Sequence, residues 1–261
     1  MTPSADSQYR TNCFSHTGYV RTKNEDRYSV EALPSKSSHP EGILIAVLAD
    51  GVGGHRAGEV AAAQTIASVQ HYFEELDTLQ DPQEALRAAV LQANQAVWQM
   101  AQADAQNKGM ACTCVCALLN EKNLTIANVG DSRIYLWRDN AIVQLTHDHT
   151  WLAEFQHEQP LETSILGRSH PFAHVLSRYI GTAHAPEVDL RMRAPARQGL
   201  ALRSGDGILL CSDGLTDMVS NQEIAGVLAQ TPFAEAAQAL VQHALDAGGK
   251  DNTTVVLVQK K

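Results

Sequence analysis

Acidic residues stand at five points of the chain where an apolar run begins or ends. They are Glu25 and Asp26 in "NED", Asp50 after "ILIAVLA", Asp131 after "LTIANVG", Asp213 after "ILLCS", and Asp251 before "TTVVLV". A single acid–glycine pair usually marks a turn, which is how we interpret Asp206 in "SGDGI". Crowded carboxylates repel one another unless cations lie between them, and ligands made only of oxygen suit Mg²⁺ or Mn²⁺. The sequence therefore predicts a site for hard cations, provided that these strand ends meet.

The elements that must position these acids follow from hydrophobic periodicity and turn residues. Strands are predicted at 9–15, 27–33, 43–49, 112–119, 124–129, 133–138, 142–145, 188–193, 207–212 and 253–258, with a hairpin turn at 138–140. Helices are predicted at 58–76, from Asp81 as N-cap onward, at 221–230 and at 233–247. Strand blocks separated by helix pairs, without strict alternation, indicate an α+β fold in which helices cover the sheets.

Composition narrows the class of protein. The chain has 261 residues and a net charge of -9, from 29 acids against 20 Lys plus Arg, which disfavours nucleic-acid binding. No apolar run approaches the roughly 20 residues of a membrane span, and the N-terminus has no signal-peptide core, so a cytoplasmic location is expected. Cys112, Cys114 and Cys116 alternate in "CTCVC" and are interpreted, like Cys211, as small residues of a buried strand and not as zinc ligands.

The glycines after Asp50 do not form a nucleotide-binding loop. A dinucleotide-binding pattern that began at Gly51 would need glycine at Arg56, and no Gly-Lys-Ser/Thr follows. The "HDH" at 147–149 lacks the second His-Asp pair of a histidine-based metal hydrolase.

Six motifs together resemble the metal-dependent Ser/Thr protein phosphatases of the type 2C (PPM) family, bacterial type. They are "VRTKNED" (20–26), "LADGVGGH" (48–55), "NVGDSR" (128–133), "LTHDHT" (145–150), "SDGL" (212–215) and "DNTT" (251–254), in the family's order. The resemblance implies a four-layer αββα sandwich, in which helices flank two central antiparallel sheets. It also implies one phosphatase domain over 1–261, with a flap beside the active site at about 146–187.

The resemblance assigns the first two metal sites residue by residue. Asp50 would bridge both metals, and the backbone carbonyl of Gly51 would be a ligand, which glycine leaves approachable. Glu25 would bind the second metal, and Asp26 would support it through water.

The resemblance assigns the remaining metal ligands to three further carboxylates. Asp213 and Asp251 would bind the first metal, while Asp131 and Asp213 would form a weaker third site. Arg21 matches the phosphate-clamping arginine, since a guanidinium can hold two phosphate oxygens at once. The implied catalytic residues are therefore Arg21 and Asp50, with Mn²⁺ or Mg²⁺ as cofactor.

The implied reaction is direct hydrolysis of phosphoserine and phosphothreonine by metal-activated water, without a covalent enzyme intermediate. Two positions depart from the pattern: His16 replaces a usual Asp, and Val52 stands where some members have a general-acid His. His55 is expected to support the site or lie at the surface. Expected partners are phosphorylated proteins, including a partner Ser/Thr kinase and its targets, and the chain is expected to be a monomer. The alternative is a catalytically weak phosphatase-fold module that binds or regulates.

Overall fold

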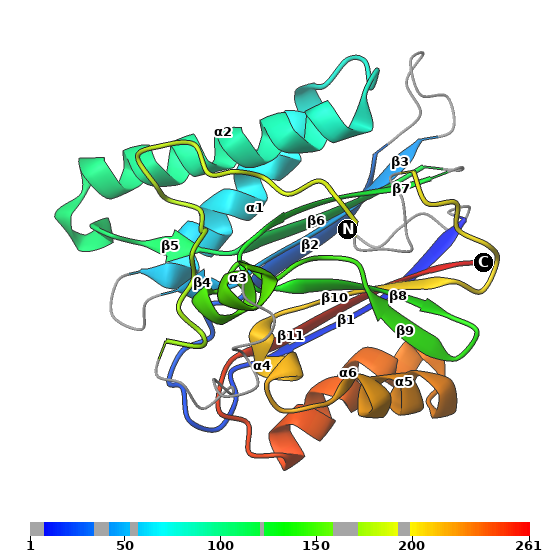
Figure 1. Ribbon diagram of the computed structural model, residues 1–261. Coiled ribbons are helices and arrows are strands. Elements are labelled where there is room, and N and C mark those ends of the chain that lie inside the picture. The colour runs from blue at the N-terminus through cyan, green and yellow to red at the C-terminus, as the bar shows by residue number, and fades with distance from the viewer. Residues whose placement is uncertain (1–7, 34–41, 53–56, 121–122, 159–171, 193–198) are drawn as a thin grey trace.

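The computed structural model describes residues 8–33, 42–52, 57–120, 123–158, 172–192 and 199–261. It forms four layers, with a helix pair, two stacked sheets and a second helix pair following one another (Figure 1). This is the predicted αββα sandwich. None of the helices in the described part of the chain is long and apolar enough to cross a membrane.

Both large sheets are antiparallel. One has the order β2-β3-β6-β7, built from β2 (Arg27–Leu33), β3 (Ile43–Ala49), β6 (Cys114–Leu119) and β7 (Leu124–Val129). The other has the order β1-β11-β10-β8-β9, built from β1 (Tyr9–His16), β11 (Thr253–Lys260), β10 (Gly207–Cys211), β8 (Arg133–Arg138) and β9 (Ala141–Gln144). A two-stranded piece, β4 (Gly51–Val52) with β5 (Ala111–Cys112), extends from the end of β3.

Three apolar clusters hold the layers together. The first packs α1 (Gly58–Glu75) and α2 (Pro82–Ala103) on the β2-β3-β6-β7 sheet, and the second lies between the sheets. The third lies under α4 (Asp213–Thr216), α5 (Asn221–Gln230) and α6 (Phe233–Asp246). The remaining helices are η1 (Ala105–Asn107) and α3 (Trp151–Glu158). Every residue of β3 is buried, so the strand that ends at Asp50 is fixed on both faces.

Local sequence signals explain several boundaries. The Asp81 side chain accepts hydrogen bonds from the backbone N–H groups of Gln83 and Glu84, which confirms it as the N-cap of α2. Asp139 and Asn140 both have positive φ, as a two-residue hairpin between twisted strands requires.

The N-terminal and C-terminal strands pair along their whole length, from Tyr9 opposite Lys260 to His16 opposite Thr253. The segment that follows β1 is thereby placed beside the segment that precedes β11. This pairing brings the "NED" motif to the same end of the sandwich as Asp251.

Three predictions about the elements were wrong. Residues 188–192 form no strand and pair with β7 only through one bridge, Asn128 to Asp189; Arg193 lies outside the described residues. The strand predicted at 112–119 is interrupted at Thr113, so β5 and β6 are separate. The expected flap region, in which no helix or strand was predicted, contains α3, and α4 was not predicted either. The cysteines of β5, β6 and β10 are fully buried and unbridged, as expected.

Candidate metal centre

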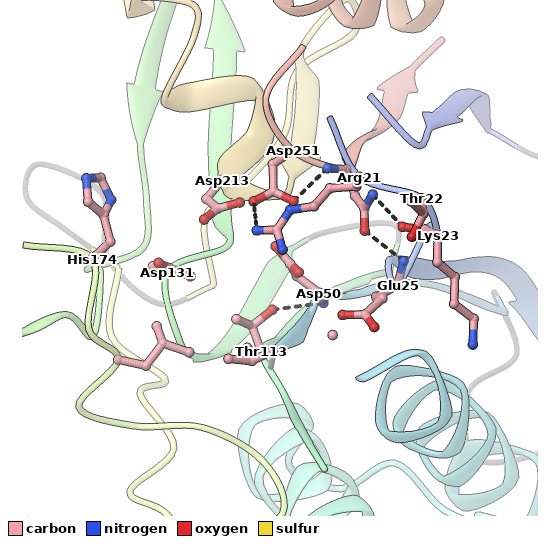
Figure 2. Close-up of a pocket in the computed structure, with 14 residues that line it drawn as sticks. Arg21, Thr22, Lys23, Glu25, Asp50, Thr113, Asp131, His174, Asp213 and Asp251 are labelled. Atoms are coloured by element: carbon pink, nitrogen blue, oxygen red, sulfur yellow. Dashed lines mark hydrogen bonds and ion pairs between the residues drawn. The ribbon is translucent and has the colours of Figure 1, made fainter. Parts of the chain in front are cut away.

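The predicted ligands meet in one pocket of about 260 Å³ at one end of the sandwich (Figure 2). It is lined by Arg21, Thr22, Lys23, Glu25, Asp50, Gly51, Val52, Thr113, Asp131, His174, Leu176, Asp213, Asp251 and Asn252. Every residue of the predicted site is in this lining except Asp26, which is buried behind it. The strand ends therefore do meet.

Asp50 is held by its backbone. Its N–H donates to Thr113 Oγ1 over 3.0 Å, and its carbonyl accepts from the Thr113 N–H over 2.8 Å. Thr113 Oγ1 also lies 2.7 Å from Ser132 Oγ, next to Asp131, and both hydroxyls are buried. One threonine thus links the backbone at Asp50 to the turn that carries Asp131.

Gly51 lies where no side chain would fit. A Cβ there would lie 2.4 Å from the carbonyl carbon of Gly58 and 2.9 Å from Glu25 Cβ. The absence of a side chain therefore lets the first turn of α1 and the Glu25 segment pack against this backbone. The glycine therefore serves close packing, and the role of its carbonyl as a ligand stays a prediction.

Asp213 is the first residue of α4, directly after β10 and Ser212. A Cβ on the following Gly214 would lie 2.0 Å from the backbone carbonyl oxygen of Asn252. The acid–glycine pair therefore lets α4 approach the start of β11, which places Asp213 beside Asp251 in Figure 2.

Asn252 fixes the loop between β1 and β2 to the start of β11. Its Oδ1 accepts from the Glu25 N–H over 2.8 Å, and its Nδ2 donates to the carbonyls of Thr17 and Lys23 over 2.8 and 2.9 Å. His16 Nδ1 accepts from the Gly18 N–H over 3.0 Å, so the unusual histidine supports the same loop.

Arg21 reaches into the pocket from this loop. Its Nη2 donates to Asp251 Oδ2 over 2.6 Å, and the two side chains are 46% and 34% exposed. The hydrogen bond to Asp251 raises the arginine's pKa, with smaller contributions from the nearby carboxylates. The guanidinium is therefore at the pocket and still reachable from solvent.

Asp26 is buried with one oxygen unsatisfied. Its Oδ2 accepts from Ser212 Oγ over 2.8 Å, whereas Oδ1 has no hydrogen-bond partner. A buried carboxylate oxygen without a partner is costly and points to a missing donor, such as a water molecule or an ion. This fits the supporting role expected of Asp26.

Electrostatic repulsion dominates the centre of the pocket. Burial, followed by the charges of Asp26, Asp213 and Asp131, raises the pKa of Asp50 well above its usual range. Burial and the neighbouring acids also raise the pKa of Asp213 well above its usual range. Burial, followed by the charges of Asp148 and Asp217, raises the pKa of Asp131 to about 7. Bound cations would relieve this repulsion and keep the acids ionised.

The donor set fits hard divalent cations, because the acids and the Gly51 carbonyl offer only oxygen. Within the described residues, no three His, Cys, Asp or Glu side chains are already gathered around one point as ligands. Asp251, for example, directs Oδ2 to Arg21. Ion binding therefore requires that some of these side chains turn.

The sequence over residues 20–253 matches the family model described as protein phosphatase 2C. The chain belongs to the protein phosphatase 2C family. It is 33% identical to the serine/threonine phosphatase stp of Listeria welshimeri, over 93% of this chain and 92% of that one. It is 37% identical to the serine/threonine protein phosphatase PstP of Mycobacterium tuberculosis, over 93% of this chain but 43% of that longer protein.

Solved protein phosphatase 2C structures have the same fold. The S. agalactiae serine/threonine phosphatase superposes with a TM-score of 0.84 at 30% identity, covering 97% of this chain and 100% of that one. The catalytic domain of PstP in complex with two manganese ions superposes with a TM-score of 0.76 at 34% identity, covering 96% and 97%.

Our sequence reasoning missed two residues that position the site, Thr113 and Asn252. A signal was present for Thr113, since it is the one hydroxyl within "ACTCVCALL". For Asn252, the sequence shows only that an amide follows Asp251. The structure also puts His174 in the pocket wall, 3.5 Å from Asp217 Oδ2, while His55 lies outside the described residues.

Proposed function

We propose that this protein phosphatase 2C member hydrolyses phosphoserine and phosphothreonine in proteins with two divalent cations bound among its clustered acids. The observation that carries the proposal is the convergence of acids from five separate segments on one pocket. In that pocket Arg21 is the only arginine of the described lining.

We assign the ligands as follows. Asp50 would lie between the two cations, with Glu25 and the Gly51 carbonyl on one side and Asp213 and Asp251 on the other. Asp26 would act through a bridging water, which its unpartnered Oδ1 supports. Asp131, together with Asp213, would form a third and weaker site, because so few protein oxygens leave an ion largely hydrated.

When bound, the cations would lower the pKa of the attacking water and offset the charge that develops on the phosphoryl group. The chain's part is to bind and orient the phosphate. We propose this role for Arg21, because its donors could leave Asp251 for two phosphate oxygens. Val52 lines the pocket and cannot donate a proton.

We propose phosphorylated proteins as substrates, among them a Ser/Thr kinase and that kinase's targets. The chain would act as a monomer in the cytoplasm. Residues 146–187 would form the flap, of which 146–158 and 172–187 are described and line one side of the pocket through His174 and Leu176.

The test uses the purified chain with p-nitrophenyl phosphate and a phosphothreonine peptide, each with Mn²⁺, with Mg²⁺ and with chelator. We expect hydrolysis only with metal. Absence of turnover with either metal, together with intact peptide binding, would instead support a binding or regulatory module.

Calorimetric titration with Mn²⁺ tests the third site separately. Asp131→Ala should keep two tight ions, lose a weak third and lower turnover on the peptide. If the variant is less stable but fully active and still binds three ions, Asp131 only stabilises the turn between β7 and β8 and is not a metal ligand.

A further inference from the structure

The most exposed large apolar side chains of the described residues belong to the two segments that carry Arg21 and His174 into the pocket lining. Seven such side chains are exposed by more than a third, and the four most exposed are Val20 (67%), Tyr19 (65%), Phe172 (59%) and Val175 (50%). Tyr19 and Val20 directly precede Arg21, and Phe172 and Val175 lie on either side of His174. We call these four residues the apolar rim. Exposed apolar groups that gather in this way mark a surface that another molecule covers.

The first half of the rim is fixed in place. The Tyr19 N–H donates to the Gly249 carbonyl over 2.7 Å, and the ring lies against Gly249, where a Cβ would be 2.9 Å from Tyr19 Cδ2. The His16 ring packs at a near right angle with centroids 6.1 Å apart. Tyr19 is therefore exposed although its backbone and one ring face are held.

The second half is anchored to α3. The Trp151 N–H donates to the Val175 carbonyl over 2.9 Å, and Thr150 forms a bridge with Leu176. The Phe172 ring packs edge-on against Trp151, with centroids 6.4 Å apart. Figure 2 shows His174, which stands between Phe172 and Val175 in the chain, on the opposite side of the pocket from Arg21. The segments that carry the two halves of the rim thus lie on opposite sides of the pocket.

We propose that the apolar rim binds the side chains next to the phosphorylated residue of a protein substrate and selects apolar ones. The inference rests on the proposed function, since a phosphate held by Arg21 fixes where its own chain must run. An extended peptide advances about 3.3–3.6 Å per residue, so neighbours within three positions of the phosphoresidue can reach the segments that carry the rim.

The basic groups around the pocket leave little for acidic neighbours of the phosphoresidue to pair with. Arg21 is paired with Asp251, Lys23 with Glu59, and His174 lies 3.5 Å from Asp217. An acidic side chain placed over the rim would lose water without gaining a partner, whereas an apolar one would cover exposed apolar surface. The substrate class is therefore a phosphoserine or phosphothreonine flanked by Leu, Ile, Phe or similar residues.

The test compares two phosphothreonine peptides on one enzyme preparation. One carries Leu and Phe at the two positions on each side of the phosphothreonine, and the other carries Ser and Asn there, so their net charges are equal. We expect kcat/KM with Mn²⁺ to favour the apolar peptide by about tenfold. The double variants Tyr19→Ser/Val20→Ser and Phe172→Ser/Val175→Ser should each bring this ratio toward one.

The ratio is insensitive to poor folding, because an inactive fraction lowers both rates equally. Val143→Ser is the matched control, since Val143 is 39% exposed on β9 and is not part of the pocket lining. It should keep the full preference.

Equal kcat/KM for the two peptides in the wild type, or an unchanged ratio in both rim variants, would overturn the proposal. So would light scattering that shows a dimer which only the rim variants lose, with the ratio unchanged, because the rim would then be a self-association surface. If neither peptide is hydrolysed with metal, the proposed function fails. The rim is then tested by the ratio of the peptides' Kd values in fluorescence anisotropy, with the same variants and the same expectation.

Discussion

Strand β10 lies between two acid–glycine pairs, Asp206–Gly207 at its start and Asp213–Gly214 just beyond its end, and the two acids have opposite surroundings. Asp206 accepts from Arg138 Nε and Nη2 over 3.0 and 2.6 Å and from the Arg203 N–H over 2.6 Å. Burial alone would raise the pKa of Asp206, but these donors lower it overall. For Asp213, burial and neighbouring acids raise the pKa well above its usual range, and no Lys or Arg in the described part of the chain pairs with it.

The two ends of β10 also differ in how the nearby arginine is paired. We call the start of β10, at Asp206, the far end, and the other end, at Asp213, the pocket end. Arg138 and Asp206 share two hydrogen bonds, and their side chains are 21% and 5% exposed. Arg21 and Asp251 share one hydrogen bond, and both of their side chains are much more exposed than those of Arg138 and Asp206. The far end has its charges balanced within the chain. At the pocket end the acids repel one another, and the ion pair of Arg21 is exposed to solvent.

The largest expected effect comes from removing charge at the pocket end. Asp50→Asn and Asp213→Asn should each lower kcat by on the order of 1,000-fold, because each removes a metal ligand while keeping its size. Without metal, each variant should be at least as stable as the wild type, since one of the repelling charges is gone. Steady-state kinetics at saturating Mn²⁺ and urea melts in chelator measure the two effects. Near-wild-type turnover in either variant would refute its assignment as a ligand.

An Asp-to-Asn substitution at the far end should have the opposite effects, lowering stability and leaving activity nearly unchanged. Asp206→Asn should lower the free energy of unfolding by about 3 kcal/mol, because Arg138 would lose its partner in a largely buried pair. Activity at a temperature where the variant is folded should stay near that of the wild type. Urea melts and rates on one preparation decide this. A variant as stable as the wild type would show that the comparison between the two ends does not hold.

Arg21→Ala tests whether the exposed arginine serves substrate and not the fold. It should raise KM for the phosphopeptide by roughly thirtyfold, which corresponds to about 2 kcal/mol for a hydrogen bond to a charged group. Mn²⁺ affinity in calorimetry should change little. Weakened metal binding with an unchanged KM would mean that Arg21 acts mainly by positioning Asp251.

Thr113 offers a finer test, because it supports Asp50 without contributing charge. Thr113→Val keeps the shape but removes the hydroxyl that accepts from the Asp50 N–H, and it should lower kcat by about tenfold. Thr113→Ser keeps the hydroxyl and should restore most of this loss. Equal rates in the two variants would show that the hydroxyl does not position Asp50.

The smallest expected effect is on the pH dependence of stability without metal. The raised pKa of Asp131, about 7, means that the folded protein binds protons more tightly than the unfolded chain. Its stability should therefore fall as pH rises from about 4 to about 7. Asp206, with its lowered pKa, contributes stability above about pH 4 that is lost in stronger acid.

Thermal melts in chelator at about pH 5 and about pH 7 should differ by about 3 °C, with the higher Tm at the lower pH. Asp131→Asn should reduce this difference, and Asp206→Asn should leave it unchanged. A wild type that melts at a higher temperature at about pH 7 would contradict the repulsion inferred for the pocket end.

Sequence reasoning succeeded where a local pattern determines the structure. The run Ile43–Ala49 is too apolar and too short to be anything but a buried strand, so the position of Asp50 at its end followed directly. Asp81 and Pro82 marked the start of α2 for an equally local reason. The roles of individual acids came from the family resemblance, since spacing alone could not show that the strand ends meet.

Sequence reasoning failed where contacts between residues far apart in the chain determine the secondary structure. Residues 188–192 alternate apolar and polar like a strand, yet they meet β7 at a single bridge and so form no ladder. Thr113 sits within a β-rich run, but its bonds to Asp50 break that run in two. α4 has only four residues, too few for any helical period to be visible.

The pairing of β1 with β11 has a consequence for how the protein is made. β1 is an edge strand whose partner in the sheet is β11, so it leaves the ribosome long before the strand it pairs with exists. At typical rates of synthesis, that delay is on the order of 10 to 50 s. During this time Arg21 cannot meet Asp251, which lies 230 residues later. A nascent chain that has already built every described helix would still lack the contact between Arg21 and Asp251, so the pocket is complete only once translation has passed the last strand.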